Sequence, residues 1–149
     1  MSVKFDLKKE IIEKCLSIKK EQFNALHESQ RLQLESTSTA NLDQQDKTES
    51  PREGMMQVIE NTASSLDFLA EQVNVLESLQ TEGLHTRVSL GSVVYTSMGK
   101  FLIAVAQDKF QVQDVLYQGI SAQSPFFKKI EGLSSGDHFD ENQEILKVF

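Results

Sequence analysis

Asp43, Asp46 and Glu49 are the residues of this chain whose types and spacing most favour chemistry. They recur every three residues within a polar segment, residues 36–50, that is rich in Ser, Thr, Gln and Asp. Mg²⁺ prefers one or two carboxylates in proteins, with water or a substrate phosphate completing an octahedron. The spacing therefore fits a magnesium site, and a solvated acidic loop is the alternative interpretation.

Other reactive residue types are sparse. Cys15 is the single cysteine, which excludes an intramolecular disulfide, and His27, His85 and His138 are scattered along the chain. These numbers and spacings argue against a zinc site. Cys15 falls on an apolar stripe, where a buried packing role is expected rather than a nucleophilic one. The sequence has no Gly-rich phosphate loop and no plausible catalytic triad.

Composition indicates a soluble folded protein. The chain has 149 residues, 39% of them hydrophobic and 25% charged, with a net charge of -7. This length fits one ordinary domain or two small ones, and no apolar run approaches the roughly 20 residues that span a bilayer. Because residues 1–6 lead directly into a charged segment without a signal-peptide core, we expect a cytoplasmic location.

The charge is unevenly distributed, and its balance argues against broad, non-specific nucleic-acid binding. A basic cluster near the start of the chain could face RNA or an acidic polymerase surface, or could be a solvated helix face. Its members are Lys8, Lys9, Lys14, Lys19 and Lys20.

Two predicted helices flank the acidic segment. Residues 4–35 lack Gly and Pro, and an apolar stripe runs through Leu7, Ile11, Cys15 and Ile18. We expect this seam to continue more weakly along the outer half of the helix. The positions are Gln22, Ala25, Ser29 and Leu32, with Phe23 and Leu26 beside them.

The second helix has a predicted start and a longer seam. Ser50 at the N-cap, Pro51 at the first helical position and Glu53 at the third form a capping box, and Gly83 is expected to cap the end. Successive seam residues are four and then three positions apart, a spacing that continues for three heptads. The seam residues are Met55, Ile59, Thr62, Leu66, Leu69, Val73 and Leu76.

These patterns predict an α+β fold. Residues 1–82 form an antiparallel two-helix coiled-coil hairpin whose tip loop, residues 36–50, carries the acids. Residues 83–149 form a small antiparallel β-domain with strands predicted at 88–95, 101–106, 115–120, 138–139 and 144–148. Ser124 caps a short helix over residues 126–131, and His138 beside Asp137 is expected to be an exposed turn histidine.

The segment 118–137, QGISAQSPFFKKIEGLSSGD, resembles the C-terminal signature of the GreA and GreB family of bacterial transcript-cleavage factors. In that family an Ile-Ser strand leads into Ser-Pro, a short helix and a Gly-Lys-x-x-Gly-Asp turn. Residues 90–94, LGSVV, are similar to the first strand of the same domain. The preceding helical hairpin with an acidic tip also follows the family's order.

The resemblance implies an FKBP-like C-terminal domain that docks on the rim of the secondary channel of RNA polymerase. Docking would use Ser121, Ser124, Pro125 and Phe126. The hairpin would enter the channel, and the polymerase, not this chain, would cut backtracked RNA. The chain would thus be an accessory monomer without enzymatic activity or a stably bound cofactor, in indirect contact with nascent RNA and with no membrane partner.

At the tip, the resemblance implies that Asp43 and Asp46 help hold a Mg²⁺ ion and its water, with Glu49 nearby. The family pattern is Asp-Leu-x-Glu-Asn-x-Glu-Tyr. Here Asp46 stands in the place of its first Glu, Lys47 replaces Asn and Ser50 replaces Tyr. Aspartate is shorter than glutamate and Lys47 adds a positive charge, so we expect weaker metal binding than in the family.

Four functions remain open. The first is a Gre-type factor that stimulates cleavage, and the second is a Gre-like regulator that occupies the channel without cleavage. The third is a coiled-coil interaction module, such as a homodimer, unrelated to transcription. The fourth is a peptidyl-prolyl isomerase, which an FKBP-like fold permits, although residues 86–149 have no pattern for an aromatic-lined pocket.

Overall fold

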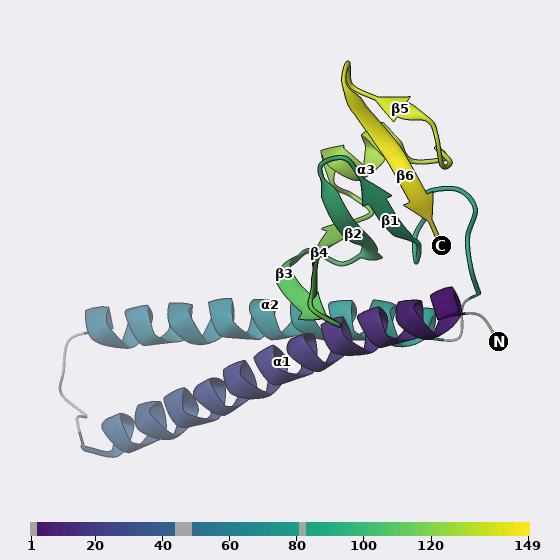
Figure 1. Ribbon diagram of the computed structural model, residues 1–149. Coiled ribbons are helices and arrows are strands. Elements are labelled where there is room, and N and C mark those ends of the chain that lie inside the picture. Colours follow the sequence, from purple (N-terminus) through teal and green to yellow (C-terminus); the bar gives the residue numbers. More distant parts are fainter. Residues whose placement is uncertain (1–2, 44–48, 81–82) are drawn as a thin grey trace. The chain divides into compact units, whose positions relative to one another are not determined.

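The computed structural model describes residues 3–43, 49–80 and 83–149, with the backbone alone for residues 36–43 and 49–55. A helical hairpin is followed by a six-stranded sheet and a short helix, which confirms the predicted fold class (Figure 1). The elements are α1 (Val3–Asp43), α2 (Glu49–Leu79), β1 (Val93–Thr96), β2 (Gly99–Ala104), β3 (Gln107–Val112), β4 (Val115–Ser121), α3 (Pro125–Ile130), β5 (His138–Phe139) and β6 (Gln143–Val148).

Contacts divide the chain into two compact units. The first combines residues 1–17 with residues 74–149, and the second is residues 18–73. The base of the hairpin therefore belongs to the same unit as the sheet, whereas the outer parts of both helices form a unit of their own. The predicted domain boundary at residue 83 stays a prediction.

The outer unit is an antiparallel pair of helices with a partly polar seam. Thr62 and Leu66 of α2 are buried, and the Thr62 hydroxyl donates to the Val58 carbonyl and lies 3.4 Å from the Gln33 amide oxygen of α1. Lys19 and Gln72 are also buried. The seam therefore contains polar side chains within the coiled coil.

The predicted outer seam of α1 is wrong by about one residue. Gln22, Ala25, Ser29 and Leu32 are exposed. The partly buried positions are instead Phe23, Leu26, Gln30 and Gln33. Small and polar side chains at the predicted positions offer little apolar area to bury, whereas Phe23 and Leu26 supply that area and set the face that turns inward.

Both helices extend farther toward the tip than predicted. Helix α1 continues to Asp43 and α2 begins at Glu49, so much of the segment predicted as a loop is helical. Ser50 therefore lies inside α2 rather than at its N-cap. Serine, threonine and asparagine cost only tenths of a kcal/mol each in a helix, a cost that an already nucleated helix tolerates.

Ile11, Ile12 and Cys15 lie in the buried base of the hairpin, together with Leu76 and Leu79. The thiol of Cys15 is buried, as the packing prediction required.

Helix α2 ends at Leu79, so the prediction that Gly83 caps it is wrong. The Gly83 carbonyl instead accepts a hydrogen bond of 2.7 Å from the Lys8 ammonium, which is almost fully buried.

The sheet has the strand order β3-β4-β2-β1-β6-β5. Its pairs are antiparallel except for β2 and β4, which are parallel. Strand β3 was not predicted, because Gln107, Asp108 and Lys109 have low β-propensity. Only Phe110 and Val112 are buried on this edge strand, where polar residues are common.

Apolar side chains fill the space between the sheet and α3. The cluster is Val88, Val94, Phe101, Ile103, Phe127, Ile130, Phe139 and Ile145. Strand side chains alternate between faces, so Phe101 and Ile103 point to this core whereas their neighbours point to the other face. Helix α3 is only six residues long, and its position depends on this packing.

Replacing Gly119 with alanine is expected to cost about 1–3 kcal/mol of folding free energy through overpacking. A Cβ atom there would lie 2.8 Å from the Gln107 Cβ and would also overlap the Val105 carbonyl. Gly83→Ala is the matched control, since nothing lies within 4 Å of the added atom. Urea denaturation measures both variants, and equal free energies of unfolding would contradict the packing argument.

Candidate functional site

The predicted tip acids are Asp43, Asp46 and Glu49. The structure gives only the backbone of Asp43, at the end of α1, and of Glu49, at the start of α2. Asp46 lies outside the described residues. The magnesium site therefore stays a prediction. Among the described side chains, no group of three or more His, Cys, Asp or Glu could hold a metal ion.

The predicted polymerase-binding residues do come together, at the junction between β4 and α3. Ser121 ends β4, and its hydroxyl accepts a hydrogen bond of 3.1 Å from the Gln123 backbone N–H. The Ser124 hydroxyl accepts a hydrogen bond of 3.1 Å from the Phe127 backbone N–H, and Pro125 is the first helical residue. The predicted cap is confirmed, and this serine stabilises the helix start.

Phe126 of this junction is partly buried. Its ring centre lies 5.0 Å from that of Phe101 and 5.9 Å from that of Phe139, the latter in an edge-on arrangement. Such pairs stabilise a core beyond the area they bury. Phe126 therefore fixes the junction against the sheet while part of its ring stays accessible.

The carboxylate of Asp137 closes the turn at residues 134–137, where the Gre-like segment ends. Asp137 accepts hydrogen bonds from the Ser134 backbone N–H at 2.8 Å and from the Ser134 hydroxyl at 3.2 Å. Gly136 has a φ of 95°, a left-handed conformation that glycine adopts without strain. His138 is exposed as predicted, but it lies in β5 with its Nε2 3.3 Å from a Glu144 carboxylate oxygen.

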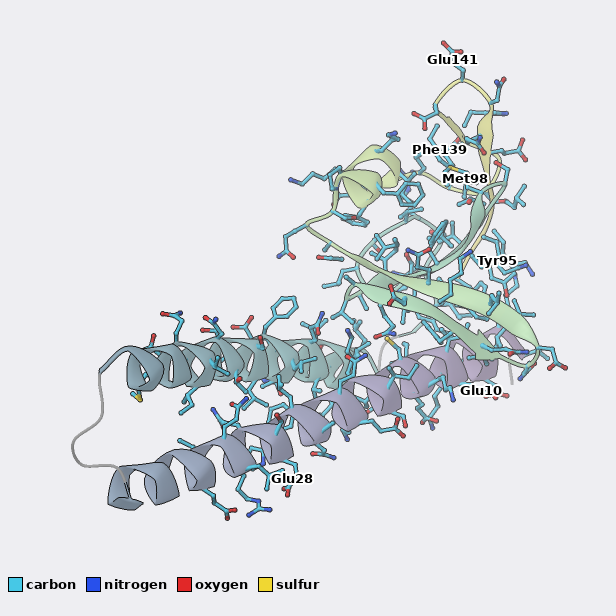
Figure 2. The ribbon with its side chains drawn as sticks, turned by 90° about the vertical axis from the view of Figure 1, so that its left-hand side faces the viewer. Glu10, Glu28, Tyr95, Met98, Phe139 and Glu141 are labelled. Carbon is cyan, nitrogen blue, oxygen red and sulfur yellow. The ribbon has the colours of Figure 1, made fainter. Side chains whose placement is uncertain are left out.

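A pocket of about 460 Å³ lies beside β2, β4 and the start of α3. Its lining is Met98, Gly99, Lys100, Phe101, Lys109, Leu116, Tyr117, Gln118, Ile120 and Phe126. Met98, which Figure 2 labels, lies in the turn between β1 and β2. Met98 and Leu116 are both 56% exposed. Two lysines and no carboxylate line this pocket, so it suits an apolar group that carries negative charge.

This pocket corrects the expectation that the domain lacks an aromatic-lined pocket. Phe101, Tyr117 and Phe126 all contribute to it, from β2, β4 and the start of α3. Because the lining comes from separate elements, no local sequence pattern marks it. The one local signal was the adjacent pair Phe126 and Phe127, whose first ring remains only partly covered.

Comparisons with known proteins were made on both sequence and structure. No protein-family model matches the chain, and no curated protein matches it significantly. The solved structures that resemble it include transcription factor Gfh1, at 16% identity and a TM-score of 0.39, covering 95% of this chain and 93% of that one. GreA factor homolog 1 of Thermus thermophilus has 15% identity, a TM-score of 0.31 and coverages of 90% and 94%.

Gfh1 of Thermus aquaticus, at 15% identity and a TM-score of 0.30, covers 96% of this chain and 94% of its own. Similarities at this level do not establish a family. No described helix is long and apolar enough to cross a membrane.

The predicted basic cluster is divided by burial. Lys8 and Lys19 are buried, so their ammonium groups are withdrawn from any surface patch. Lys9, Lys14 and Lys20 are exposed. Whether these three contact RNA stays a prediction, with a smaller patch than the sequence indicated.

The opposite face of the sheet carries a pair of tyrosines that the sequence analysis did not single out. The hydroxyls of Tyr95 and Tyr117 lie 2.8 Å apart, from β1 and β4. Burial, followed by the hydrogen bond with Tyr95, raises the pKa of Tyr117 well above its ordinary value. The folded state therefore holds this proton more tightly than the unfolded state does.

The Tyr117 contribution to stability should be complete below about pH 10 and decrease above it, because the unfolded tyrosine then ionises first. The loss of unfolding free energy between about pH 9 and pH 11 is expected to be smaller in Tyr117→Phe than in the wild type. Urea denaturation at a series of pH values measures this difference. Parallel pH profiles for the two proteins would show that Tyr117 does not hold its proton more tightly when folded.

Proposed function

We propose that this chain is a Gre-like factor that binds RNA polymerase, with its hairpin in the secondary channel and its C-terminal domain on the channel rim. The carrying observation is the segment 120–137, whose sequence resembles the Gre signature. Strand β4, the Ser124 cap, α3 and the turn at Asp137 follow along this segment in the order that the signature implies. The preceding hairpin of two helices supports the same proposal.

The pocket beside this segment supplies a docking surface in the proposal. Met98 and Leu116 expose apolar area at its rim, and Phe126 joins it to the β4–α3 junction. Lys100 and Lys109 would attract an acidic partner surface and orient the encounter. Apolar anchors supply most of the affinity in such interfaces, so Leu116 is the residue that we expect to matter most.

We further propose that the tip acids Asp43 and Asp46 assist cleavage of backtracked RNA. Two carboxylates can help hold a Mg²⁺ ion at the polymerase active site, where the ion activates water and stabilises the leaving oxygen. The polymerase would supply the remaining ligands and the chemistry, so the chain would be an accessory factor rather than an enzyme.

Leu116→Gln is expected to weaken binding to core RNA polymerase about tenfold, because it removes one exposed apolar anchor. Leu146→Gln is the matched control, since Leu146 is 51% exposed on β6 and does not line the pocket. Biolayer interferometry with the full chain measures both affinities, and thermal unfolding confirms that both variants are folded. Equal affinities would exclude the pocket as the docking surface.

Cleavage is tested with a stalled, backtracked elongation complex to which the full chain is added. Shortening of the RNA is expected with the wild type and should be lost in the double variant Asp43→Asn, Asp46→Asn, which should still bind the polymerase. The amide cannot replace the carboxylate charge at the metal.

Three outcomes separate the alternatives. Binding without RNA shortening by the wild type would support the regulator that occupies the channel without cleavage. Failure to bind, with a dimeric mass in solution, would support the unrelated coiled-coil module. Shortening by the double variant equal to that by the wild type would remove the role of the tip acids.

A further inference from the structure

One rung of the sheet places two lysines on either side of a tyrosine. In the strand register Tyr95 of β1 pairs with Lys100 of β2 on one side and with Lys147 of β6 on the other. Cross-strand partners project from the same face of a sheet. The Lys100 ammonium lies 5.0 Å from the centre of the Tyr95 ring and the Lys147 ammonium 5.4 Å from it.

Neither ammonium is neutralised within the described part of the chain, where no carboxylate lies within 4.0 Å of either one. This is unusual in a chain whose net charge is -7. Val93 and Leu102 on the same face are buried, and the Phe149 ring packs edge-on against Tyr95 at 5.5 Å. The charge of Glu10 acts on Tyr117 and contributes to the rise of its pKa. Among the described residues, two lysines therefore share one tyrosine ring without an ion pair to either ammonium.

The hydroxyls of Tyr95 and Tyr117 add a hydrogen-bond donor beside the two lysines, and either hydroxyl can donate to the other. Of two hydroxyls 2.8 Å apart, one donates to the other, and the accepting hydroxyl keeps its own hydrogen for another acceptor. Tyr117 is buried whereas Tyr95 is half-buried. When Tyr117 donates, the Tyr95 hydrogen is available to an acceptor that approaches from the solvent side.

We propose that Lys100, Lys147 and Tyr95 form a binding site for a phosphate group. Two ammonium groups and one phenol O–H match an anion that has several oxygens and up to two negative charges. The lysine stems rotate freely, so both ammonium groups can converge on one anion. This site shares Lys100 with the proposed polymerase docking pocket, whereas Tyr95 and Lys147 do not line that pocket.

Cation–π attraction alone could account for the lysine positions, since each such contact stabilises an exposed site by roughly 0.5–1 kcal/mol. That explanation predicts no affinity for an added anion. A phosphate site predicts saturable binding that depends on both lysines. Titration with a phosphate compound therefore distinguishes cation–π attraction alone from a phosphate site.

The test is an NMR titration of the full chain with inorganic pyrophosphate, observed on the rings of its two tyrosines. The expected result is a saturable shift of the Tyr95 and Tyr117 signals. Lys100→Gln and Lys147→Gln should each weaken the affinity about fivefold to tenfold, the size expected for the net loss of one hydrogen bond at an exposed site. Tyr95→Phe should weaken the affinity for pyrophosphate by a smaller factor and leave the fold intact. Binding to this variant is followed on the signals of the Tyr117 ring.

Lys128→Gln is the control for general charge, because Lys128 is exposed on α3 and its loss changes the net charge equally. It should alter the affinity less than twofold, or about 0.4 kcal/mol. A shift that does not saturate, or equal weakening by Lys128→Gln, would overturn the proposal. Polymerase binding by Lys147→Gln and Tyr95→Phe is measured separately. Neither residue lines the docking pocket, so failure of one proposal does not decide the other.

A second titration identifies the source of the phosphate. If the site takes a nucleic-acid backbone, a short single-stranded RNA should shift the same tyrosine signals at lower concentration than pyrophosphate. If it takes a free phosphorylated metabolite, a nucleoside triphosphate should bind and the RNA should not. Both results support the site, and the absence of a saturable shift with all three ligands would refute it.

Discussion

The close approach of β3 to Gly119 is the constraint on which the C-terminal sheet depends. Strand β4 pairs with β2 in parallel and with β3 in antiparallel fashion, and Gly119 lies opposite both Leu102 and Gln107. The Val105 carbonyl and the Gln107 side chain occupy the space that a larger residue would need. The lack of a side chain at one position therefore lets β3 cover this edge of β4, and β3 in turn supplies Lys109 to the pocket and Phe110 to the opposite face.

The two faces of this sheet have different chemistry because side chains alternate along each strand. On one face Phe101 and Ile103 meet α3, which is too short to cover the whole surface, so a pocket remains beside Phe126. On the other face Tyr95 and Tyr117 share a hydrogen bond. The pocket offers apolar area, whereas the tyrosine face offers hydrogen-bond donors and positive charge.

Sequence reasoning succeeded where one segment determines its own structure. Ser124 and Pro125 specify the start of α3 through a local hydrogen bond and a fixed φ, and the structure has this cap. Heptad spacing predicted α2 for the same reason. Sequence reasoning failed where the structure of a segment depends on distant residues. Residues 107–112 are largely polar, and they form β3 because β4 offers an open edge for pairing.

The pocket and the phosphate site could not be predicted for a related reason. Lys100 and Lys147 are 47 positions apart (147 − 100) and meet at Tyr95 only through strand pairing. The register shift between Tyr95 and Thr96 further changes which β6 residue faces the tyrosine, and an irregularity of that kind leaves no sequence signal. A single sequence indicates which residues could bind a phosphate but not which of them converge.

The hairpin shows how stability is distributed along its length. At the base, Ile11, Cys15 and Leu76 are fully buried, whereas the outer seam includes Lys19, Thr62 and Gln72. Within the described part of the chain, the buried Gln72 amide oxygen has no hydrogen-bond partner, which costs free energy. Each polar layer also buries less apolar area than a leucine would. The outer part of the hairpin should therefore open at a lower free energy than the base.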